Sequence, residues 1–487
     1  MTTALEGQLF IGGAEVPPGV LDRVEHINPA NGRVQGSVPV AGAKEIDRAV
    51  SAARAALGSW REMAAGQRRE LLIAVATEIE NDVVELARLA VAENGTPRRF
   101  ADQLGCASAT GWFRYYAGWP DKLSGEVLAK LNPGTSRLDY TVPEPHGVVA
   151  ILTAFNAPMS FLGMKVAAAL AAGNTVVIKP SELAPFTTDR FARLCARAGV
   201  PAGVVNVVHG DGSTGAALVG HPGIDKISFT GSADTASRIL VAAAVNLTPA
   251  ALELGGKSAA VIFDDARIED AVQICIQRGI ATQAGQACLA PTRMLVQRGA
   301  YDKAVGLAAA VTEELVVGDP SDERTQVGPV ISGFHRDRIL GVIAEADGRD
   351  GRLVSGGVGL GGALADGFYV EPTVLADVAP GSSIAQQEIF GPVLSMIPFD
   401  DEDEAVSIAN GTGYELAAYA FTASIPRAHR MVRRLAAGNV SINTVAFPSP
   451  HRPFGGNGRS GMGREGGREG LQEMLRTKYV EIDLADD

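Results

Sequence analysis

Cys288 stands where its thiol could act as a nucleophile. It lies in the short stretch 285–290 beside the small residues Gly285 and Ala287, at the end of an apolar helical run over 271–281. A thiolate attacks a carbonyl only when the substrate can reach the sulfur, and small neighbours keep that approach open. Because a lone intracellular cysteine is more often a small apolar filler of the core, the case for catalysis depends on the residues around it.

A carboxylate and an amide are the other candidate catalytic groups. Glu253 ends an apolar strand and is followed by Gly255 and Gly256, so we expect a buried carboxylate with a raised pKa that can activate water. Asn156 lies between a strand and a helix that begins at Pro158, where its amide N–H could stabilise a developing alkoxide together with the backbone N–H of the cysteine. The alternative for Asn156 is a helix cap.

An alternation of β-strands and α-helices must position these groups. Short runs of branched residues alternate with helices from Gly147 onward, and a second such series runs from about 258 to 443. This alternation predicts parallel crossover units, and hence an α/β protein with doubly wound sheets. The expected strands cover 148–152, 175–179, 204–208, 226–230, 259–263, 293–297 and 393–399, and the expected helices cover 158–172 and 185–198.

The amino-terminal third has a different pattern. Helical spacing of apolar residues predicts amphipathic helices over 43–57 and 68–92. The aromatic stretch 112–119 is interpreted as core packing, with substrate contact as the alternative. Residues 136–145 alternate between polar and apolar and are bounded by prolines, which predicts an exposed strand that needs covering.

Length and charge exclude several classes. The chain has 487 residues and a net charge of −12, enough for two or three domains with a large core. There is no basic patch, so we expect no nucleic-acid partner. The uncharged stretch 147–164 is interrupted by Asn156 and Pro158, and is interpreted as a buried strand–loop–helix and not as a membrane span.

Cysteine usage and the amino terminus suggest the compartment. The four cysteines have neither disulfide-framework nor metal-site spacing, so we expect a reducing compartment and no metal site. The amino terminus has no basic start and no apolar run, so no signal peptide is expected. Together these features predict a cytoplasmic protein.

Three strings that contain the candidate residues resemble the NAD(P)-dependent aldehyde dehydrogenase superfamily. They are LELGGK at 252–257, GQAC at 285–288 and QEIFGP at 387–392, and the resemblance covers nearly the whole chain. It implies the aldehyde dehydrogenase fold, with Rossmann-like β/α cofactor and catalytic domains and a small antiparallel oligomerisation hairpin. The implied NAD-binding domain is 1–122 with 146–255, the catalytic domain is 256–455, and the oligomerisation strands are 123–145 and 471–487.

The resemblance also implies a mechanism. Cys288 would add to an aldehyde to give a thiohemiacetal stabilised by Asn156, and hydride transfer to the nicotinamide would leave a thioester. Water activated by Glu253 would then release the acid, and Lys165 would assist proton movement. Since the family branch that acylates coenzyme A typically lacks this glutamate, Glu253 favours hydrolysis.

The cofactor site is expected at the turn of Gly231 and Ser232, where a strand ends and a helix opens. Backbone N–H groups and the helix dipole at such a turn suit a pyrophosphate. Glu182 could bind the adenosine ribose and repel a 2′-phosphate, which favours NAD over NADP, with NADP possible. The alternative for Lys179 and Glu182 is a solvated loop pair. The cofactor-binding residues implied by the resemblance are Phe155, Lys179, Glu182, Gly231, Ser232, Glu388 and Phe390.

The residues that flank these motifs would line the route of the aldehyde. They are Ala157, Phe161, Met164, Leu289 and Phe447. Because they are apolar, and Ala157 is small, we expect aromatic or longer aliphatic aldehydes as the small-molecule partner. The resemblance further implies a homo-oligomer, a dimer or a tetramer.

The chain departs from the family pattern near its carboxyl end. Arg476 stands where many relatives carry a second glutamate, so we expect an auxiliary proton-relay role to be lost. Gly458 replaces a usual lysine, and the basic charge moves to Arg459.

Other functions stay open. A semialdehyde dehydrogenase would need an arginine for the distal carboxylate, and Arg452 and Arg114 are the candidates. A catalytically silent binding protein on the same fold could lose Cys288, Glu253 or Asn156, yet all are present. A Cys/His hydrolase would need a positioned histidine, and the seven histidines fall outside the motifs.

Overall fold

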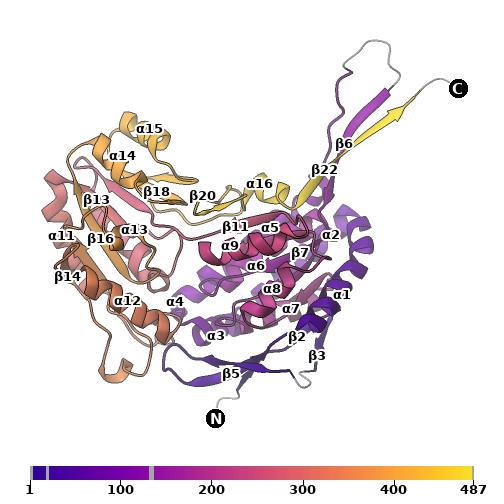
Figure 1. The fold of residues 1–487 in the computed structure, drawn as a ribbon, viewed down its shortest axis with the longest axis horizontal. Coiled ribbons are helices and arrows are strands. Elements are labelled where there is room, and N and C mark those ends of the chain that lie inside the picture. The colour runs from indigo at the N-terminus through magenta and orange to yellow at the C-terminus, as the bar shows by residue number, and fades with distance from the viewer. Residues whose placement is uncertain (1–3, 18–20, 131–136, 485–487) are drawn as a thin grey trace.

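The protein is described by a computed structural model over residues 4–17, 21–130 and 137–484. Figure 1 shows an amino-terminal α/β body in indigo and magenta beside a second α/β body in orange, and a ribbon of two strands that projects away from the first. Within the described ranges, every helix is too short or too polar to span a lipid bilayer.

The first sheet carries the expected β/α series. Its strand order is β21-β11-β10-β7-β8-β9-β2-β3, and the run from β11 to β9 is parallel. Neighbouring side chains of β7 alternate between two apolar cores, one on each face of the sheet. The strands are β2 (Leu9–Ile11), β3 (Ala14–Val16), β7 (Val148–Leu152), β8 (Thr175–Lys179), β9 (Val205–Val207), β10 (Lys226–Thr230), β11 (Ala250–Glu253) and β21 (Gly461–Met462).

The helices of this body bury apolar faces on both sides of the sheet. They are α1 (Ala43–Glu62), α2 (Ala65–Asn81), α3 (Val83–Asn94), α4 (Arg98–Ala101), α5 (Ser108–Ala117), α6 (Pro158–Ala172), α7 (Phe186–Arg197), α8 (Gly212–Val219), α9 (Ala233–Ala244) and α16 (Gly467–Gln472). Trp112, Phe113 and Tyr116 of α5 are buried against α6, so the aromatic stretch is core, as expected. A small sheet of β1 (Leu5–Glu6), β5 (Val34–Pro39) and β4 (Arg23–Ile27) lies beside it.

The prediction of one helix over 68–92 is wrong. The backbone of Asp82 leaves the helical region at φ −108° and ψ 11°, and separates α2 from α3. Its carboxylate accepts a hydrogen bond of 2.6 Å from Nε of Arg190 on α7. Aspartate has a low helix propensity, and the ion pair with Arg190 holds its side chain at the break.

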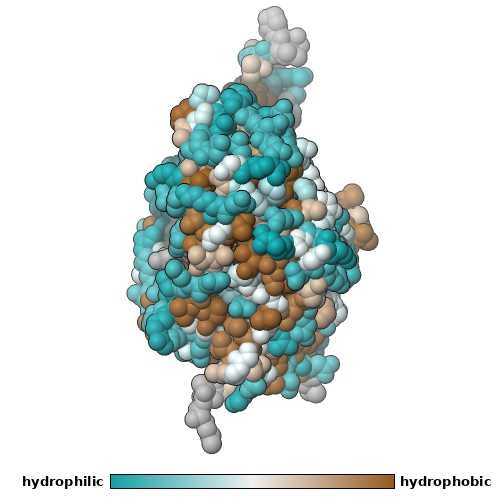
Figure 2. Space-filling model, turned by 90° about the vertical axis from the view of Figure 1, so that its left-hand side faces the viewer, coloured by the Kyte–Doolittle hydropathy of each residue, from teal (hydrophilic) through white to brown (hydrophobic). Residues whose placement is uncertain are grey.

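The second sheet has the strand order β14-β15-β16-β13-β12-β18-β19, so the doubly wound α/β class is confirmed. Figure 2 shows the face formed by its helices, where polar side chains break up the apolar patches. The strands are β12 (Ala259–Ile262), β13 (Arg293–Gln297), β14 (Arg352–Ser355), β15 (Thr373–Ala376), β16 (Val393–Phe399), β18 (Ala417–Phe421) and β19 (Asn439–Ile442). The helices are α10 (Ile268–Ile276), α11 (Arg298–Glu313), α12 (Gly333–Ala346), α13 (Ser383–Gln386), α14 (Glu402–Asn410) and α15 (Ile425–Arg434).

The projecting ribbon joins the residues expected to pair subunits. β6 (Arg137–Pro145) and β22 (Leu475–Asp483) are antiparallel over their full lengths. Ser136, the first residue of the expected strand, lies outside the described residues. A short pair, β17 (Tyr414–Glu415) with β20 (Asn457–Gly458), ties the carboxyl-terminal segment to the second body.

Candidate active site

The loop before Cys288 has an unusual backbone. α10 ends at Ile276, a π-helical turn covers 277–281, and then Gln283, Ala284 and Gly285 all adopt left-handed conformations, at φ 53°, 51° and 70°. A Cβ at Gly285 would clash with the carbonyl oxygen of Gly391, so only glycine fits there. Consecutive left-handed residues outside glycine are strained, and such strain is typical of functional loops.

Cys288 is half-buried and lines a cavity of about 380 Å³ with Asn156, Phe161 and Glu388. Burial, followed by the carboxylates of Glu388 and Glu253, raises the pKa of the Cys288 thiol to about 12. The thiol is therefore protonated at neutral pH, and nucleophilic attack requires that a base take its proton.

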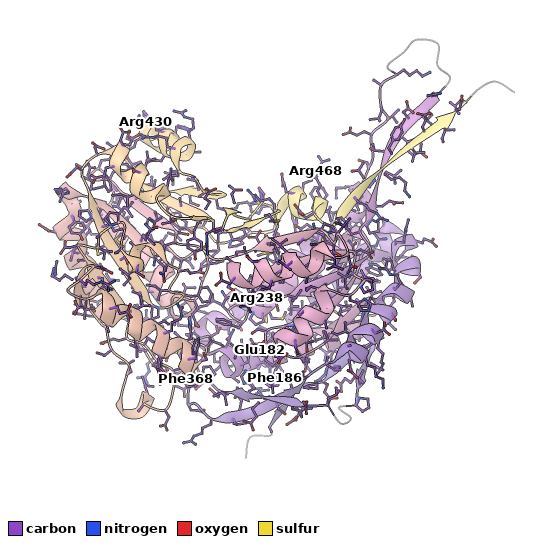
Figure 3. The ribbon with its side chains drawn as sticks, viewed as in Figure 1. Glu182, Phe186, Arg238, Phe368, Arg430 and Arg468 are labelled. Atoms are coloured by element: carbon purple, nitrogen blue, oxygen red, sulfur yellow. The ribbon has the colours of Figure 1, made fainter. Side chains whose placement is uncertain are left out.

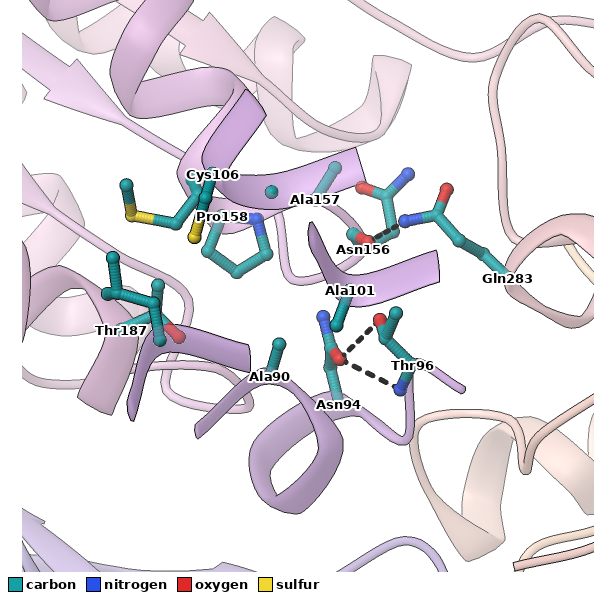
Figure 4. Close-up of a pocket in the computed structure, with 13 residues that line it drawn as sticks. Ala90, Asn94, Thr96, Ala101, Cys106, Asn156, Ala157, Pro158, Thr187 and Gln283 are labelled. Atoms are coloured by element: carbon teal, nitrogen blue, oxygen red, sulfur yellow. Dashed lines mark hydrogen bonds between the residues drawn. The ribbon is translucent and has the colours of Figure 1, made fainter. Parts of the chain in front are cut away.

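Asn156 is fixed from both sides. Its Nδ2 donates a hydrogen bond of 2.8 Å to the carbonyl of Gln286, and its own carbonyl accepts a hydrogen bond from the side chain of Gln283 (Figure 4). Since a primary amide has two N–H groups, the other remains for an oxyanion beside Cys288. The N-terminus of α6 has no side-chain cap, so the helix-cap interpretation of Asn156 is wrong.

The loop of Asn156 is held by a second amide. Asn94 donates a hydrogen bond of 3.0 Å to the carbonyl of Phe155, while its Oδ1 accepts bonds from the backbone N–H and hydroxyl of Thr96. Figure 4 shows these side chains around a void of about 20 Å³, space for about one water molecule. Sequence reasoning missed Gln283 and Asn94, because neither lies beside its hydrogen-bond partner along the chain.

Glu253 is buried at the end of β11. Its pKa is raised well above the usual value, first by burial and then by the neighbouring carboxylate of Glu465, while Lys165 opposes the shift. A Cβ at Gly455 would lie 2.8 Å from Glu253 Oε1, so glycine keeps that side of the carboxylate open. Its other oxygen, Oε2, has no protein hydrogen-bond partner within the described residues. The expected environment of a general base is present.

The position of Glu465 bears on the expectation that an auxiliary proton relay is lost because Arg476 replaces a second glutamate. The carboxylate of Glu465 pairs with Lys165, which also donates a bond of 3.1 Å to Ser228. Lys165 and Glu465 are both buried, whereas Arg476 is exposed on β22. A second carboxylate therefore stands beside Glu253, and the conclusion that the chain has lost one is wrong. The signal that marked Glu253, a glutamate next to two glycines, also marks Glu465.

Glu388 and Phe390, the residues expected at the nicotinamide end of the cofactor, line the cavity of Cys288. The backbone N–H of Gly256 donates a hydrogen bond of 2.9 Å to Glu388, and a Cβ at Gly255 would collide with this carboxylate. Burial raises the pKa of Glu388 to about 7. Phe390 is left-handed at φ 56° and packs edge-on to Phe155, with ring centroids 5.7 Å apart.

The residues expected at the adenosine end line a second cavity of about 470 Å³, which shares Phe155, Gly231 and Ser232 with the first. Lys179 and Glu182 line it with 3.6 Å between their charged atoms, so they are not a pair on an open loop. Arg238 of α9, which sequence reasoning missed, lines the same cavity and is labelled with Glu182 in Figure 3. The shared turn at the N-terminus of α9 fits a pyrophosphate that joins the two ends of a dinucleotide.

The structure does not bring the five expected tunnel residues together. Phe161 lines the cavity of Cys288, while Leu289 and Phe447 line a separate cavity of about 300 Å³. Ala157 lines the small void behind Asn156, and Met164 is buried in the core with α5.

One histidine lies in the cysteine cavity. His335 was not singled out in the sequence, and its Nε2 is 2.6 Å from the carbonyl of Phe390. Burial lowers the pKa of His335 to about 4, and its ring contacts Phe390 and Arg338. No contact of this ring with Cys288 is present in the described structure, which disfavours the Cys/His hydrolase.

Comparison with known proteins decides the family. The model of the "Aldehyde dehydrogenase family" matches residues 17–480. This chain belongs to the aldehyde dehydrogenase family. As an aldehyde dehydrogenase it is an oxidoreductase that acts on aldehydes with NAD(P), and the resemblance noted in the sequence is confirmed.

This aldehyde dehydrogenase is 39% identical to betaine aldehyde dehydrogenase of Vibrio vulnificus (strain CMCP6), over 98% of this chain and 97% of that protein. It is 38% identical to 2-hydroxymuconic semialdehyde dehydrogenase of Pseudomonas sp. (strain CF600), over 98% and 99%. Among solved structures, PnpE from Pseudomonas sp. WBC-3 matches with a TM-score of 0.96 and 38% identity, over 99% and 98% of the chains. A point mutant of Staphylococcus aureus betaine aldehyde dehydrogenase, in complex with NAD+ and with a BME-modified cysteine, matches with a TM-score of 0.95 and 35% identity, over 99% and 98%.

Proposed function

We propose that this aldehyde dehydrogenase oxidises an aldehyde to the free carboxylic acid with NAD, through a thioester on Cys288 that water hydrolyses. One observation carries the proposal. Cys288 and the fixed amide of Asn156 line the same cavity, which continues into the dinucleotide cleft, while the buried Glu253 lies close enough to raise the pKa of the thiol.

In the first step the sulfur of Cys288 bonds to the aldehyde carbon, and the thiol proton is released to solvent, so that Glu253 stays ionised. The oxygen becomes an alkoxide that accepts hydrogen bonds from the Asn156 amide and the backbone N–H of Cys288. NAD, when bound, supplies the acceptor for the hydride that leaves this carbon. Removing one oxyanion donor commonly costs about a hundredfold or more in rate.

In the second step Glu253 takes a proton from water, and the water oxygen bonds to the thioester carbon. The carbon–sulfur bond then breaks, and the thiolate of Cys288 leaves. The buried pair of Lys165 and Glu465 lies beside the base, where it can accept or supply a proton. Glu388 would bind the nicotinamide ribose, and Phe390 would pack against it.

For the substrate we favour aromatic or longer aliphatic aldehydes, since Phe161 in the cavity of Cys288, and Leu289 and Phe447 in a separate cavity, are apolar. The second candidate is a semialdehyde, in line with the name of the Pseudomonas relative. Arg452 lines the cavity of Leu289 and Phe447, which supports this candidate. Arg114 does not, because it is bonded to Glu80 on the surface at 2.6 Å.

We also propose that the protein is a homo-oligomer, a dimer or a tetramer. Leu138, Tyr479 and Ile482 are exposed apolar groups on the ribbon of β6 and β22, and β19 is the edge strand of its sheet. An unpaired edge and a projecting apolar ribbon are features that a second copy would cover. The free thiols of the four cysteines support a cytoplasmic location.

The decisive experiment is an aldehyde panel with NAD and NADP, in which reduced cofactor is measured for the native protein, Cys288→Ala and Glu253→Gln. We expect no turnover with Cys288→Ala. With Glu253→Gln we expect a burst of about one reduced cofactor per site followed by slow turnover, because the thioester accumulates. Steady turnover by Cys288→Ala would overturn the mechanism, and a native protein that reduces no cofactor would favour a silent binding protein.

A further inference from the structure

Lys257 is a buried lysine without a partner. It is 2% exposed, and its Nζ has no hydrogen-bond partner within the described residues. The other buried lysines of the described chain all have a carboxylate partner, in the pairs Lys165 with Glu465, Lys179 with Glu182, and Lys226 with Glu473. Because a buried ammonium group without a partner is strongly disfavoured, packing alone does not explain a lysine at this position.

The backbone of Lys257 is anchored just before β12. Its carbonyl accepts a hydrogen bond of 2.8 Å from Nε of Arg293, and the guanidinium of Arg293 also donates bonds of 2.7–2.8 Å to the carbonyls of Ile408 and Ala409. A guanidinium has donors only, so it cannot accept a bond from the amine of Lys257. Arg293 therefore fixes the place of this lysine without satisfying its side chain.

Glu388 is the carboxylate that acts on this amine. Its Oε1 accepts a hydrogen bond of 2.9 Å from the backbone N–H of Gly256, the residue before Lys257. Burial, followed by the charge of Arg293, lowers the pKa of Lys257 to about 7, and the charge of Glu388 opposes this shift. Burial raises the pKa of Glu388 to about 7, and the bond from Gly256, followed by the charges of Lys257 and Arg338, opposes it. Each of the two groups thus favours the charged form of the other, although no ion pair joins them in the described structure.

We propose that Lys257 is a positioning residue for the cofactor, whose positive charge keeps Glu388 ionised while that carboxylate accepts hydrogen bonds from the nicotinamide ribose. This inference rests on the proposed function, in which Glu388 binds the ribose. An ionised carboxylate accepts stronger hydrogen bonds than a neutral carboxylic acid does. Among the described residues, Lys257 does not line either cavity expected to hold the dinucleotide, so it acts through Glu388 and not by contact with NAD.

The support from Lys257 depends on pH. As the pH rises through about 7, Lys257 loses its proton, and Glu388 becomes ionised without help. The support is therefore largest near neutral pH and absent in alkaline buffer. The other ionisable groups that interact with Lys257 or Glu388 are Arg293, Arg338, Tyr414 and Cys288. Asp234, His335 and Arg459 line the cavity of Glu388 as well.

The test measures the Kd for NAD by isothermal titration calorimetry, so it does not depend on turnover. The native protein, Lys257→Met and Lys257→Gln are compared in neutral and alkaline buffer. Since loss of a nearby opposite charge moves a carboxyl pKa by about one pH unit or more, we expect the Kd of both variants to rise about fivefold at about pH 7 and less than about twofold at about pH 9. Both variants should also release more protons per bound NAD than the native protein at neutral pH, as measured by the buffer dependence of the binding enthalpy.

Two further variants make the comparison specific. Lys303→Met, at an exposed lysine paired with Glu269, is the matched control and should change neither the Kd nor the proton release. Glu388→Gln removes the group on which Lys257 acts, so adding Lys257→Met to it should cause no further rise in Kd. Methionine replaces an unpartnered buried amine by an apolar side chain, so Lys257→Met should fold, which thermal unfolding checks.

Three outcomes would overturn the inference. A Kd that rises by the same factor in neutral and alkaline buffer, or that rises equally in the Glu388→Gln background, would mean that Lys257 supports only the fold. An unchanged Kd near neutral pH would remove Lys257 from the cofactor site, yet the proposed oxidation would stand. If the native protein binds no NAD at any pH, the inference and the proposed function fail together.

Discussion

The side-chain amide of Gln283 donates a hydrogen bond to the backbone carbonyl of Asn156, across 127 positions of sequence. The bond joins the cysteine loop to the loop of the proposed oxyanion donor, and the Asn156 amide donates a bond to the carbonyl of Gln286. The backbone of Gln283 is left-handed, at φ 53°. The two catalytic loops are thus held in register by reciprocal amide bonds.

Replacing Gln283 with alanine should lower kcat, because Asn156 would lose its support and drift from the oxyanion. A misplacement of about 1 Å costs up to roughly a hundredfold, so we expect a loss of about tenfold to a hundredfold with unchanged binding of NAD. Steady-state kinetics and cofactor titration measure both quantities. Gln273→Ala on the exposed face of α10 is the control. A parallel loss of cofactor affinity would contradict the positioning role.

Alkylation of Cys288 should accelerate with pH. Since burial raises the pKa of the thiol to about 12, the thiolate fraction in the free protein rises about tenfold per pH unit from about pH 7 to about pH 10. The rate of iodoacetamide labelling, followed by mass spectrometry, should rise in the same way. Cys288→Ala serves as the control, since Cys106, Cys195 and Cys275 are buried. A plateau near neutral pH would show that the thiol is already ionised.

Glu465→Gln should shift the acid limb of the pH–rate profile to lower pH. The charge of Glu465 is one cause of the raised pKa of Glu253, so its removal lowers that pKa and keeps the base ionised in more acidic buffer. The measurement is the pH dependence of kcat for thioester hydrolysis. Glu469→Gln, at an exposed neighbour, should leave the limb in place. If the acid limb does not move in Glu465→Gln, the charge of Glu465 does not influence the pKa of Glu253.

Gly285→Ala should destabilise the protein by about 1–3 kcal/mol and abolish turnover. The new Cβ would occupy the position of the Gly391 carbonyl oxygen, at a left-handed residue. Gly58→Ala is the matched control, because Gly58 lies within α1 and its Cβ would meet nothing within 4 Å. That variant should gain about 0.5–1 kcal/mol from helix propensity. Thermal unfolding checks both, and equal stability of the two variants would refute the clash.

Glu182→Gln should improve the use of NADP. The carboxylate lines the adenosine cavity, where it would repel a 2′-phosphate, while Arg238 on the same cavity would attract one. We expect kcat/KM for NADP to rise about tenfold and that for NAD to fall less. Glu78→Gln, at a helix surface remote in sequence, controls for the change in net charge. If the ratio of kcat/KM for NADP to kcat/KM for NAD does not change, the 2′-phosphate of NADP does not lie beside Glu182.

The sequence alone determined the elements and the identity of the main chemical groups. Branched runs such as 148–152 and 175–179 have the composition of buried strands, and the strings that contain Cys288, Glu253 and Glu388 carry the resemblance to the family. These are local properties, so they can be read from neighbours in the chain. The break at Asp82 was missed because its cause, Arg190, is distant in sequence.

Only the tertiary structure decided how the site is supported. Glu465 reaches Lys165 across 300 positions, and Gln283 reaches Asn156 across 127. The expected tunnel residues show the same limit. Both Met164 and Phe447 flank motifs of the expected site, but Met164 is buried in the core of the first body and Phe447 lines a separate cavity. Burial, shared charge and hydrogen-bond direction depend on all groups around a side chain, and most of those come from other parts of the chain.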